Sequence, residues 1–426
     1  MGKSKNEAAW ELLFNEYDIL NKIKKNGVFT LSAKQINKYR EARLMTKFDH
    51  STNLPDLFKK LNLNILPITR GDYIIGEFEA YNKINYYNFK PKLIDFPSEV
   101  STIDYKDLYS EASAVNCSFV TGMIDDILGE KCLPTVNGRM VTSMFEFNIL
   151  NKDNHSTTGI VVNNSQIEID GGFESKNYFC ILEAKNYMVD DFIIRQLYYP
   201  YRLWKSKIIK KVIPVFFTFS NNIFSFFIYD FESENNYNSI KLIEQKNYTL
   251  VSDKISTSDL INLINSTNII SEPKIPFPQA DTFERILDLL FLLKNQNLTL
   301  EDITYNYSFD KRQAAYYSSA LMYLRLAIRK NEMGIAVYSL SDEGKDIISL
   351  EPRKRNLSIV KRIIEHEVFN ILLRNYLQTF QLPQKGYIIE IMQNSKSFNV
   401  DKNSSTLTRR AQTVQTWFNW LISLIQ

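Results

Sequence analysis

The chain reads Gln166-Ile-Glu-Ile-Asp-Gly-Gly-Phe-Glu174 and, three residues later, Tyr178-Phe-Cys-Ile-Leu-Glu-Ala-Lys-Asn186, and these two stretches decide its fold class. Both are rich in apolar, β-branched and aromatic residues, which predicts two buried β-strands. Gly171 and Gly172 predict a turn between the strands. Twelve residues, 171–182, separate Asp170 from Glu183. A hairpin of this length is expected to bring the two carboxylates together.

Three side chains at the ends of these strands predict a catalytic site. Alternation along a strand places Glu183 and Lys185 on one face, while Ala184 points into the core and leaves its backbone carbonyl near them. Carboxylate and carbonyl oxygens are the ligands that Mg²⁺ prefers, so Asp170, Glu183 and the Ala184 carbonyl are the predicted metal ligands. The Lys185 ammonium would stabilise negative charge on a phosphate during in-line attack by water. The competing interpretation is an ordinary Glu-x-Lys ion pair on a solvated strand face.

The sequence Ile169-Asp170, followed after about a dozen residues by Glu183-Ala-Lys185, resembles the PD-(D/E)XK nuclease signature in the form found in type II restriction endonucleases. Residues 41–49, 71–80 and 190–204 resemble parts of such enzymes that carry a C-terminal DNA-binding region. Ile169 stands where the family name has Pro. Gln196, near two tyrosines, is similar to the Gln and Tyr motif of recombination nucleases, although the spacing differs.

The resemblance implies a site-specific endonuclease that cuts double-stranded DNA with Mg²⁺ as cofactor. It also implies a homodimer, because two copies of the site would cut opposite strands of a palindrome. A DNA methyltransferase that modifies the same sequence would be its genomic partner. Two other interpretations stay open, namely a repair or recombination nuclease and a DNA-binding regulator without catalysis.

Weaker candidates surround the predicted site. Gln196 and Glu168 are further catalytic candidates. The helix expected over 105–128 carries three acids, Glu111, Asp125 and Asp126, and one of them could reach a second metal. The alternative interpretation is that these acids only solvate the exposed face of an amphipathic helix. Arg139 is a candidate phosphate contact, although a turn also explains Gly138-Arg139.

Composition excludes several classes of protein. The three histidines lack the spacing of metal ligands, which argues against zinc and against an HNH-type nuclease. The sequence has no apolar run of about 18 residues and no signal peptide, so we expect a cytoplasmic protein without a membrane partner. The net charge of +3 is uninformative by itself, but lysine and arginine pairs recur in the last third of the chain.

The predicted fold class is α/β, with a restriction-endonuclease-like mixed sheet core and mainly α-helical C-terminal winged helix-turn-helix modules. Four regions follow from the pattern of the sequence: an N-terminal mixed region (1–100), the nuclease core (101–270), a winged helix-turn-helix (279–350) and a second helix-turn-helix-like module (351–426). The core is expected to hold strands at 143–150, 159–162, 166–170, 178–183, 212–219 and 223–229. A helix over about 190–205, between the strands at 178–183 and 212–219, makes those two strands parallel neighbours.

The third region begins after Pro273, Pro276 and Pro278, three prolines in six residues, which disfavour helix and central strand. A helix over 310–328 is the predicted recognition helix, followed by a hairpin over 332–340. Its first turn offers Lys311, Arg312 and Gln313 to DNA.

The last region is expected to hold a long helix over 357–380 and a final helix that starts near Ser404. Candidate DNA contacts there are Ser405, Thr406, Arg409 and Arg410, because hydroxyls bind phosphate and arginines bind phosphates or guanine edges. Trp417 and Trp420 are expected to anchor the core.

Overall fold

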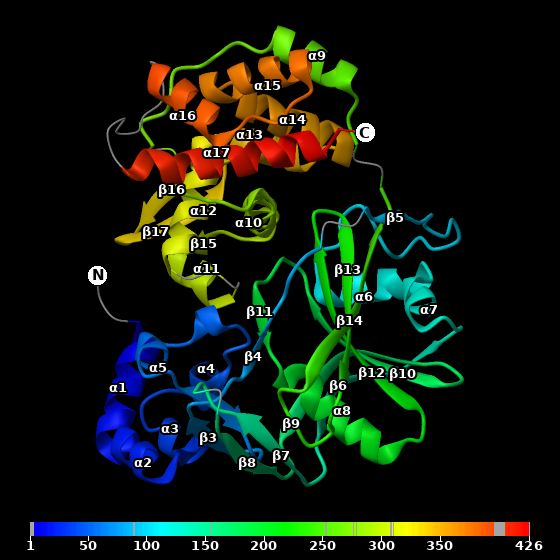
Figure 1. Cartoon of the computed structure of the whole chain (residues 1–426), viewed down its shortest axis with the longest axis vertical. Helices are drawn as coiled ribbons and strands as arrows, with labels where there is room; N and C mark the ends of the chain where they lie inside the picture. The colour runs from blue at the N-terminus through cyan, green and yellow to red at the C-terminus, as the bar shows by residue number, and fades with distance from the viewer. Residues whose placement is uncertain are drawn as a thin grey trace. The chain divides into compact units, whose positions relative to one another are not determined.

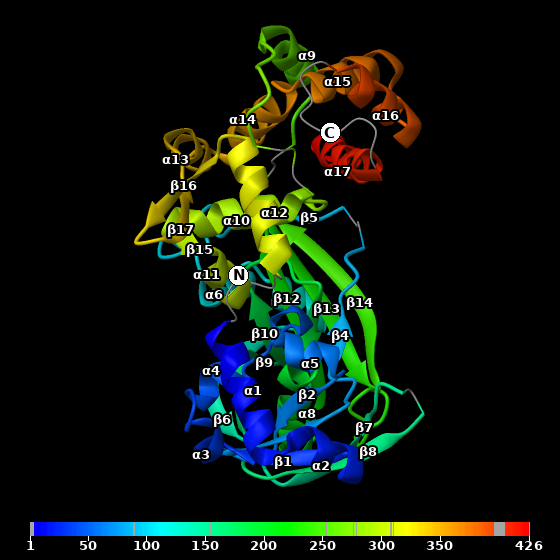
Figure 2. The same cartoon turned by 90° about the vertical axis from the view of Figure 1, so that its left-hand side faces the viewer.

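The computed structural model describes residues 4–87, 90–153, 155–251, 254–275, 277, 279–306, 309, 311–395 and 405–425, without the side chains of 305, 306, 311 and 405. The chain divides into two compact units (Figures 1 and 2). Unit 1 comprises Met1–Phe219 and Ile223–Tyr248, and unit 2 comprises Ser220–Asn222 and Thr249–Gln426. Within the described residues, no helix combines the length and the apolar composition needed to cross a membrane.

The N-terminal lobe of unit 1 packs short helices on a three-stranded sheet of order β1-β3-β2, drawn in blue in Figure 1. The buried Trp10 side chain contacts the rings of Phe14 and Phe58 edge-on, and its Nε1 donates to the Met45 carbonyl. The elements are α1 (Lys5–Tyr17), α2 (Ile19–Asn26), β1 (Val28–Ser32), α3 (Ala33–Ile36), α4 (Ala42–Thr46), the 3₁₀ helix η1 (Ser51–Asn53), α5 (Asp56–Lys60), β2 (Asn64–Pro67) and β3 (Asp72–Gly76).

The rest of unit 1 is built around a seven-stranded sheet of order β5-β14-β13-β12-β10-β9-β6, counted over the described residues. Strands β10 and β12 are parallel, which confirms the predicted crossover, while β9 runs antiparallel to β10 and to β6. The elements are β4 (Tyr81–Lys83), β5 (Lys92–Leu93), α6 (Glu111–Val120), α7 (Met123–Leu128), β6 (Leu133–Val141), β7 (Phe145–Leu150), β8 (Thr157–Val162), β9 (Gln166–Glu174), β10 (Tyr178–Lys185), β11 (Asp191–Ile193), α8 (Arg195–Lys207), β12 (Lys211–Ser220), β13 (Ile223–Phe231) and β14 (Ile240–Thr249).

Gly171 and Gly172 do not form the turn of the hairpin, so that prediction is wrong. They lie within β9, opposite Leu182 and Ile181 of β10. A Cβ atom at Gly171 would come within 3.1 Å of the Val115 side chain on α6, and one at Gly172 would come within 2.9 Å of the Val136 carbonyl oxygen. The glycines therefore allow close packing against β9 rather than a reversal of the chain.

Two predicted helices of unit 1 differ from the observed ones. The helix expected over 105–128 is split into α6 and α7, because Gly122 adopts a left-handed conformation with φ of 74°. The helix expected from residue 190 begins only at Arg195, because Asp191–Ile193 pairs with Tyr81–Lys83 as strand β11.

Unit 2 is mainly helical. Its first half arranges α10, α11 and α12 beside a three-stranded sheet of order β15-β17-β16, the composition predicted for a winged helix-turn-helix. The elements are α9 (Thr257–Ser266), α10 (Phe283–Asn295), β15 (Leu298–Thr299), α11 (Leu300–Asn306), α12 (Lys311–Tyr323), β16 (Ala327–Glu332), β17 (Ile335–Leu340), α13 (Asp342–Ile348), α14 (Pro352–Ile364), α15 (Glu367–Thr379), α16 (Lys385–Asn394) and α17 (Ser405–Ser423).

The predicted recognition helix is shorter than expected. Helix α12 ends at Tyr323, and Arg325 turns the chain with φ of 60°, so residues 327 and 328 already belong to strand β16. The long helix expected over 357–380 is two helices, α14 and α15. Asp310, the predicted cap of α12, lies outside the described residues.

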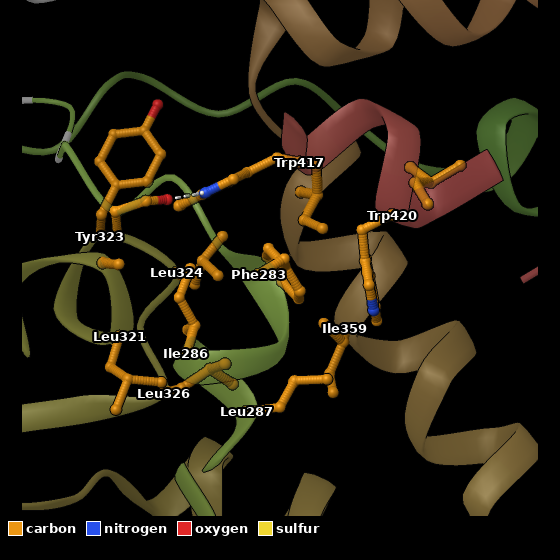
Figure 3. Packing of buried hydrophobic residues seen from close by; sticks show 14 of the residues in the cluster. Phe283, Ile286, Leu287, Leu321, Tyr323, Leu324, Leu326, Ile359, Trp417 and Trp420 are labelled. Carbon is orange, nitrogen blue, oxygen red and sulfur yellow. Dashed lines mark hydrogen bonds between the residues drawn. The ribbon is translucent and has the colours of Figure 1, made fainter. Parts of the chain in front are cut away.

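One continuous apolar core holds unit 2 together (Figure 3). Trp417 of α17 is fully buried in it and packs against the rings of Phe277, Phe283 and Phe369. Its Nε1 donates to the Ala280 carbonyl at 2.8 Å. The prediction that the α17 tryptophans anchor the core is confirmed.

Candidate active site

Strands β9 and β10 bring the predicted carboxylates together. Leu182 lies opposite Gly171 in their antiparallel register, and extending the register by one residue sets Glu183 opposite Asp170. The backbone N–H of Ala184 donates to Asp170 Oδ2 at 2.8 Å. The strand pairing itself therefore fixes Asp170 beside the Glu-Ala-Lys sequence.

Lys185 is hydrogen-bonded to both residues that precede it, Glu183 and Ala184. Its Nζ donates to Glu183 Oε1 at 2.6 Å and to the Ala184 carbonyl oxygen at 3.0 Å. Glu183 is only 7% exposed and Lys185 only 6%, and Ala184 is fully buried. A buried ion pair at the end of a strand does not fit the interpretation of an ordinary pair on a solvated face.

The charges of the site are strongly coupled. Burial raises the pKa of Glu183 to about 8, and the attraction of Lys185 opposes this rise while the negative charges of Asp170 and Asp49 add to it. Burial would lower the pKa of Lys185, but the carboxylates of Glu183, Glu111, Asp49 and Asp170 together raise that pKa well above its usual value. Lys185 therefore keeps its positive charge, which the surrounding acidic side chains stabilise.

Glu111 lies in this group, as the sequence allowed. It begins helix α6 and interacts electrostatically with Lys185 and Asp170, and burial raises the pKa of its carboxyl. The other two acids of the predicted helix lie elsewhere. Asp125 pairs with Lys131 at 2.9 Å, and Asp126 accepts a hydrogen bond from Tyr248.

Asp49 is a member of the site that the sequence did not identify. Its backbone carbonyl accepts from Ile193 N of β11 at 2.9 Å, which attaches the segment after α4 to the core. Burial raises the pKa of the Asp49 carboxyl, but the cations, with Lys185 first and Lys47 next, outweigh burial and leave the pKa below its usual value. The only signal in the sequence is that Asp49 ends a stretch, 41–49, that resembles the nuclease family.

Gln196 joins the site and Glu168 does not. Gln196, in the first turn of α8, donates from Nε2 to Glu183 Oε1 at 2.5 Å, and its own Oε1 is buried without a hydrogen-bond partner. Glu168 is more than half exposed and lies 3.5 Å from Arg139 on β6. Arg139 is thus in strand β6 and in an exposed ion pair, rather than in the turn that its neighbour Gly138 suggested.

The oxygen donors of the site fit a hard cation. Asp170 and Glu183 supply carboxylates and Ala184 supplies a carbonyl, all within one hydrogen-bonded group. Glu183 Oε1 and the Ala184 carbonyl oxygen both accept hydrogen bonds from the Lys185 ammonium, so two of the three oxygen donors already have a positively charged partner. Among the described residues, no cluster of three or more His, Cys, Asp or Glu side chains has metal-binding geometry.

The candidate DNA contacts of unit 2 differ in their surroundings. Arg312 is exposed in the first turn of α12, with Nη2 3.5 Å from the Tyr316 hydroxyl, and Arg409 is exposed on α17. Gln313 and Thr406 are partly buried. The side chains of Lys311 and Ser405 lie outside the described part of the chain.

Arg410 is less exposed than Arg409. Its side chain is partly buried, its Nε and Nη1 are buried without hydrogen-bond partners, and burial lowers the pKa of its guanidinium. Among the predicted arginines, Arg312 and Arg409 are therefore the better placed for phosphate contact.

The raised pKa of Glu183 predicts a pH dependence of stability in EDTA. The folded state binds a proton at Glu183 up to about pH 8, whereas the unfolded state releases it near the usual value of 4.5. Stability contributed by this group is therefore present at low pH and lost as the pH rises from about 5 to about 8. We expect urea unfolding to show this loss in the wild type and a smaller one in Glu183→Gln. Equal pH dependence in the two proteins would contradict the prediction.

Three family models match consecutive parts of the chain. Residues 7–75 match a domain of unknown function (DUF6996), residues 76–249 match a second (DUF6997) and residues 285–426 match a third (DUF7226). Asp49 falls within the first match, whereas Glu111, Asp170 and Glu183 fall within the second. No curated protein and no solved structure matches the chain.

Proposed function

We propose that the protein is a Mg²⁺-dependent, sequence-specific endonuclease for double-stranded DNA, of the type II restriction class. The observation that carries the proposal is the hydrogen-bonded group of Asp170, Glu183, the Ala184 carbonyl and Lys185 at the end of two paired strands. Its residue types, spacing and burial are those that a phosphodiesterase of the PD-(D/E)XK kind needs.

In this mechanism, Asp170, Glu183 and the Ala184 carbonyl would hold Mg²⁺. The bound ion would supply positive charge to the scissile phosphate and make a coordinated water more acidic. Lys185 would donate hydrogen bonds to the phosphate oxygens and to the water that attacks phosphorus in line, and its fixed charge would stabilise the negative charge that develops. Gln196 would keep Glu183 Oε1 in place by its hydrogen bond.

The remaining parts of the proposal follow the family resemblance. Unit 1 would have a restriction-endonuclease-like core, and residues 279–350 and 351–426 of unit 2 would be modules that select the DNA sequence. A homodimer would cut both strands, and a methyltransferase with the same specificity would protect the host DNA in the cytoplasm. The mixed seven-stranded sheet supports the first part, since it shares its coarse architecture with such cores.

Incubation of phage DNA with the full-length protein tests the proposal. We expect discrete fragments with Mg²⁺ and intact DNA with EDTA, and sequencing of the fragment ends would give the recognised sequence. A smear would instead support a repair or recombination nuclease. Intact DNA in both samples, together with specific binding, would support a regulator without catalysis. This regulator is the second candidate function, and the observation that favours it is the contact of Lys185 with the Glu183 and Ala184 oxygens.

Replacement of Arg312 by alanine tests the predicted recognition helix. We expect weaker binding to the cleaved sequence, by about 1–3 kcal/mol if Arg312 makes a bidentate base contact. Lys24→Ala removes an exposed cation from α2 of unit 1 and serves as the control. Fluorescence anisotropy in EDTA gives both affinities, and equal affinities for the two variants would remove Arg312 from the interface.

A further inference from the structure

A groove of about 1220 Å³ lies on unit 2, at one end of the β16–β17 hairpin. The end of α10 and the residues after it, 293–297, form one wall, and the first residues of β16, 327–330, form another. Residues 339–345, from the end of β17 into α13, complete it. This end of the hairpin is opposite its turn at Met333 and Gly334, so the groove is separate from the tip of the wing.

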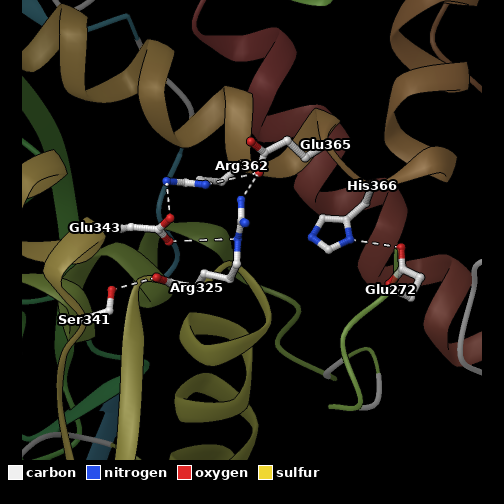
Figure 4. A network of polar contacts seen from close by, with 7 residues as sticks. All are labelled: Glu272, Arg325, Ser341, Glu343, Arg362, Glu365 and His366. Carbon is white, nitrogen blue, oxygen red and sulfur yellow. Dashed lines mark hydrogen bonds and ion pairs between the residues drawn. The ribbon is translucent and has the colours of Figure 1, made fainter. Parts of the chain in front are cut away.

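Positive charge dominates the walls of the groove. Five cations and two acids, Asp342 and Glu343, line it. Arg325 pairs with Glu365 and Glu343 (Figure 4), and Lys345 lies 3.0 Å from Asp342. The other three cations are Lys294, Arg329 and Lys330.

Arg329 and Lys330 are the most available of these cations. They are consecutive and exposed on β16, which is an edge strand, and both line the groove because it wraps around that edge. Neither makes an ion pair with any residue that the structure describes. Their charges are thus available to an anionic ligand.

The other lining residues indicate which polyanion fits. Side chains that can form neutral hydrogen bonds, such as Gln296, Asn297 and Ser339, line the groove together with the cations. Contacts of this kind, with arginine and lysine, are those that proteins make to the sugar–phosphate backbone of DNA. Among the described residues, the lining contains no Trp, Tyr, Phe or His, so it lacks the aromatic platforms on which the bases of a single strand stack.

We propose that this groove binds the sugar–phosphate backbone of duplex DNA and adds a sequence-independent contact to the protein. The inference rests on the proposed function insofar as that function makes DNA the substrate. The contact is distinct from the predicted recognition surface, because Arg312 and Gln313 do not line the groove. It would hold the protein on DNA of any sequence and would weaken as salt rises.

A matched pair of double variants of the full-length protein tests the groove. The first is Arg329→Gln with Lys330→Gln. The control is Lys24→Gln with Lys25→Gln, which removes the same charge from two consecutive exposed positions on α2 of unit 1. Anisotropy titrations in EDTA would use a labelled 30-base-pair duplex and the corresponding single strand, at several NaCl concentrations.

We expect the groove variant to bind the duplex roughly tenfold more weakly than the wild type, with the slope of log K against log salt reduced by about two. The control should keep the wild-type affinity and slope. An unchanged groove variant, an equal loss in the control, or a greater loss for the single strand than for the duplex would each overturn the inference.

A cleavage assay with Mg²⁺ separates this inference from the proposed function. A wild-type protein that never cuts DNA, but loses duplex affinity in the groove variant, would contradict the endonuclease and support the groove. A wild-type protein that cuts at discrete sites, with a groove variant of unchanged affinity and slope, would support the endonuclease and overturn the groove.

Discussion

Asp170→Asn is expected to reduce the rate of DNA cleavage by roughly a thousandfold, because it removes one of the two carboxylates that would hold the cation beside the scissile phosphate. The substitution keeps the shape of the side chain, so the strand pairing of β9 and β10 should survive. Affinity for DNA in EDTA should stay close to that of the wild type, because unit 2 is proposed to supply the sequence contacts.

Glu174→Gln is the matched control for this experiment. Glu174 ends the same strand β9, and its Oε1 lies 2.6 Å from Lys210 Nζ in an ion pair, but it is at the other end of the pairing with β10. We expect this variant to cut DNA at the wild-type rate. Undiminished cleavage by Asp170→Asn would mean that the active site lies elsewhere, and equal losses in both variants would point to a general effect on the fold.

Trp417→Ala is expected to destabilise unit 2 by about 3–5 kcal/mol, because it removes a large side chain from the centre of the core. The indole is fully buried among three phenylalanine rings and satisfies its N–H at Ala280 O, so its loss would leave both a cavity and an unpaired carbonyl. A loss of this size is a large fraction of the free energy of unfolding of a typical domain.

Hydrogen exchange measured by mass spectrometry is the suitable readout, since a chain of two units need not unfold in a single transition. Peptides from α10 and α17 should lose protection in Trp417→Ala, whereas peptides from β9 and β10 should keep it. Trp420→Phe is the control, because a phenyl ring can keep the stacking on Phe283, where the rings are 4.0 Å apart. Unchanged protection in Trp417→Ala would show that the α17 indole is not essential to this core.

The sequence predicted the centre of the candidate site because its geometry is local. Glu183 and Lys185 are two residues apart on one strand, and Asp170 lies on the strand paired with it, so strand periodicity and one antiparallel register bring the three together. The parallel pairing of β10 with β12 followed from the intervening helix for a similar reason.

The remainder of the site depends on contacts that no short pattern encodes. Asp49 interacts electrostatically with Lys185 because its segment attaches to β11, far along the chain, and the sequence predicts a helix where β11 lies. The sequence predicts a turn at Gly171 and Gly172, because composition does not distinguish a glycine that reverses the chain from one that allows a helix or strand to approach closely. In unit 2, the end of α12 depended on the positive φ of Arg325, which is unusual for a residue with a side chain.

The contact of Lys185 with the Glu183 and Ala184 oxygens has a consequence for how the protein folds in the absence of metal. Carboxylates that lie close together usually repel one another in the absence of a bound cation. Here the Lys185 ammonium, on the same strand as Glu183, neutralises part of this repulsion as soon as β9 and β10 pair. The protein should therefore fold in a chelating buffer with Asp170, Glu183 and Lys185 already in contact, and under the proposed function this state would be the metal-free enzyme. In the proposed endonuclease, Glu183 and the Ala184 carbonyl would hold Mg²⁺ in place of the ammonium, and Lys185 would be available to bind the DNA phosphate.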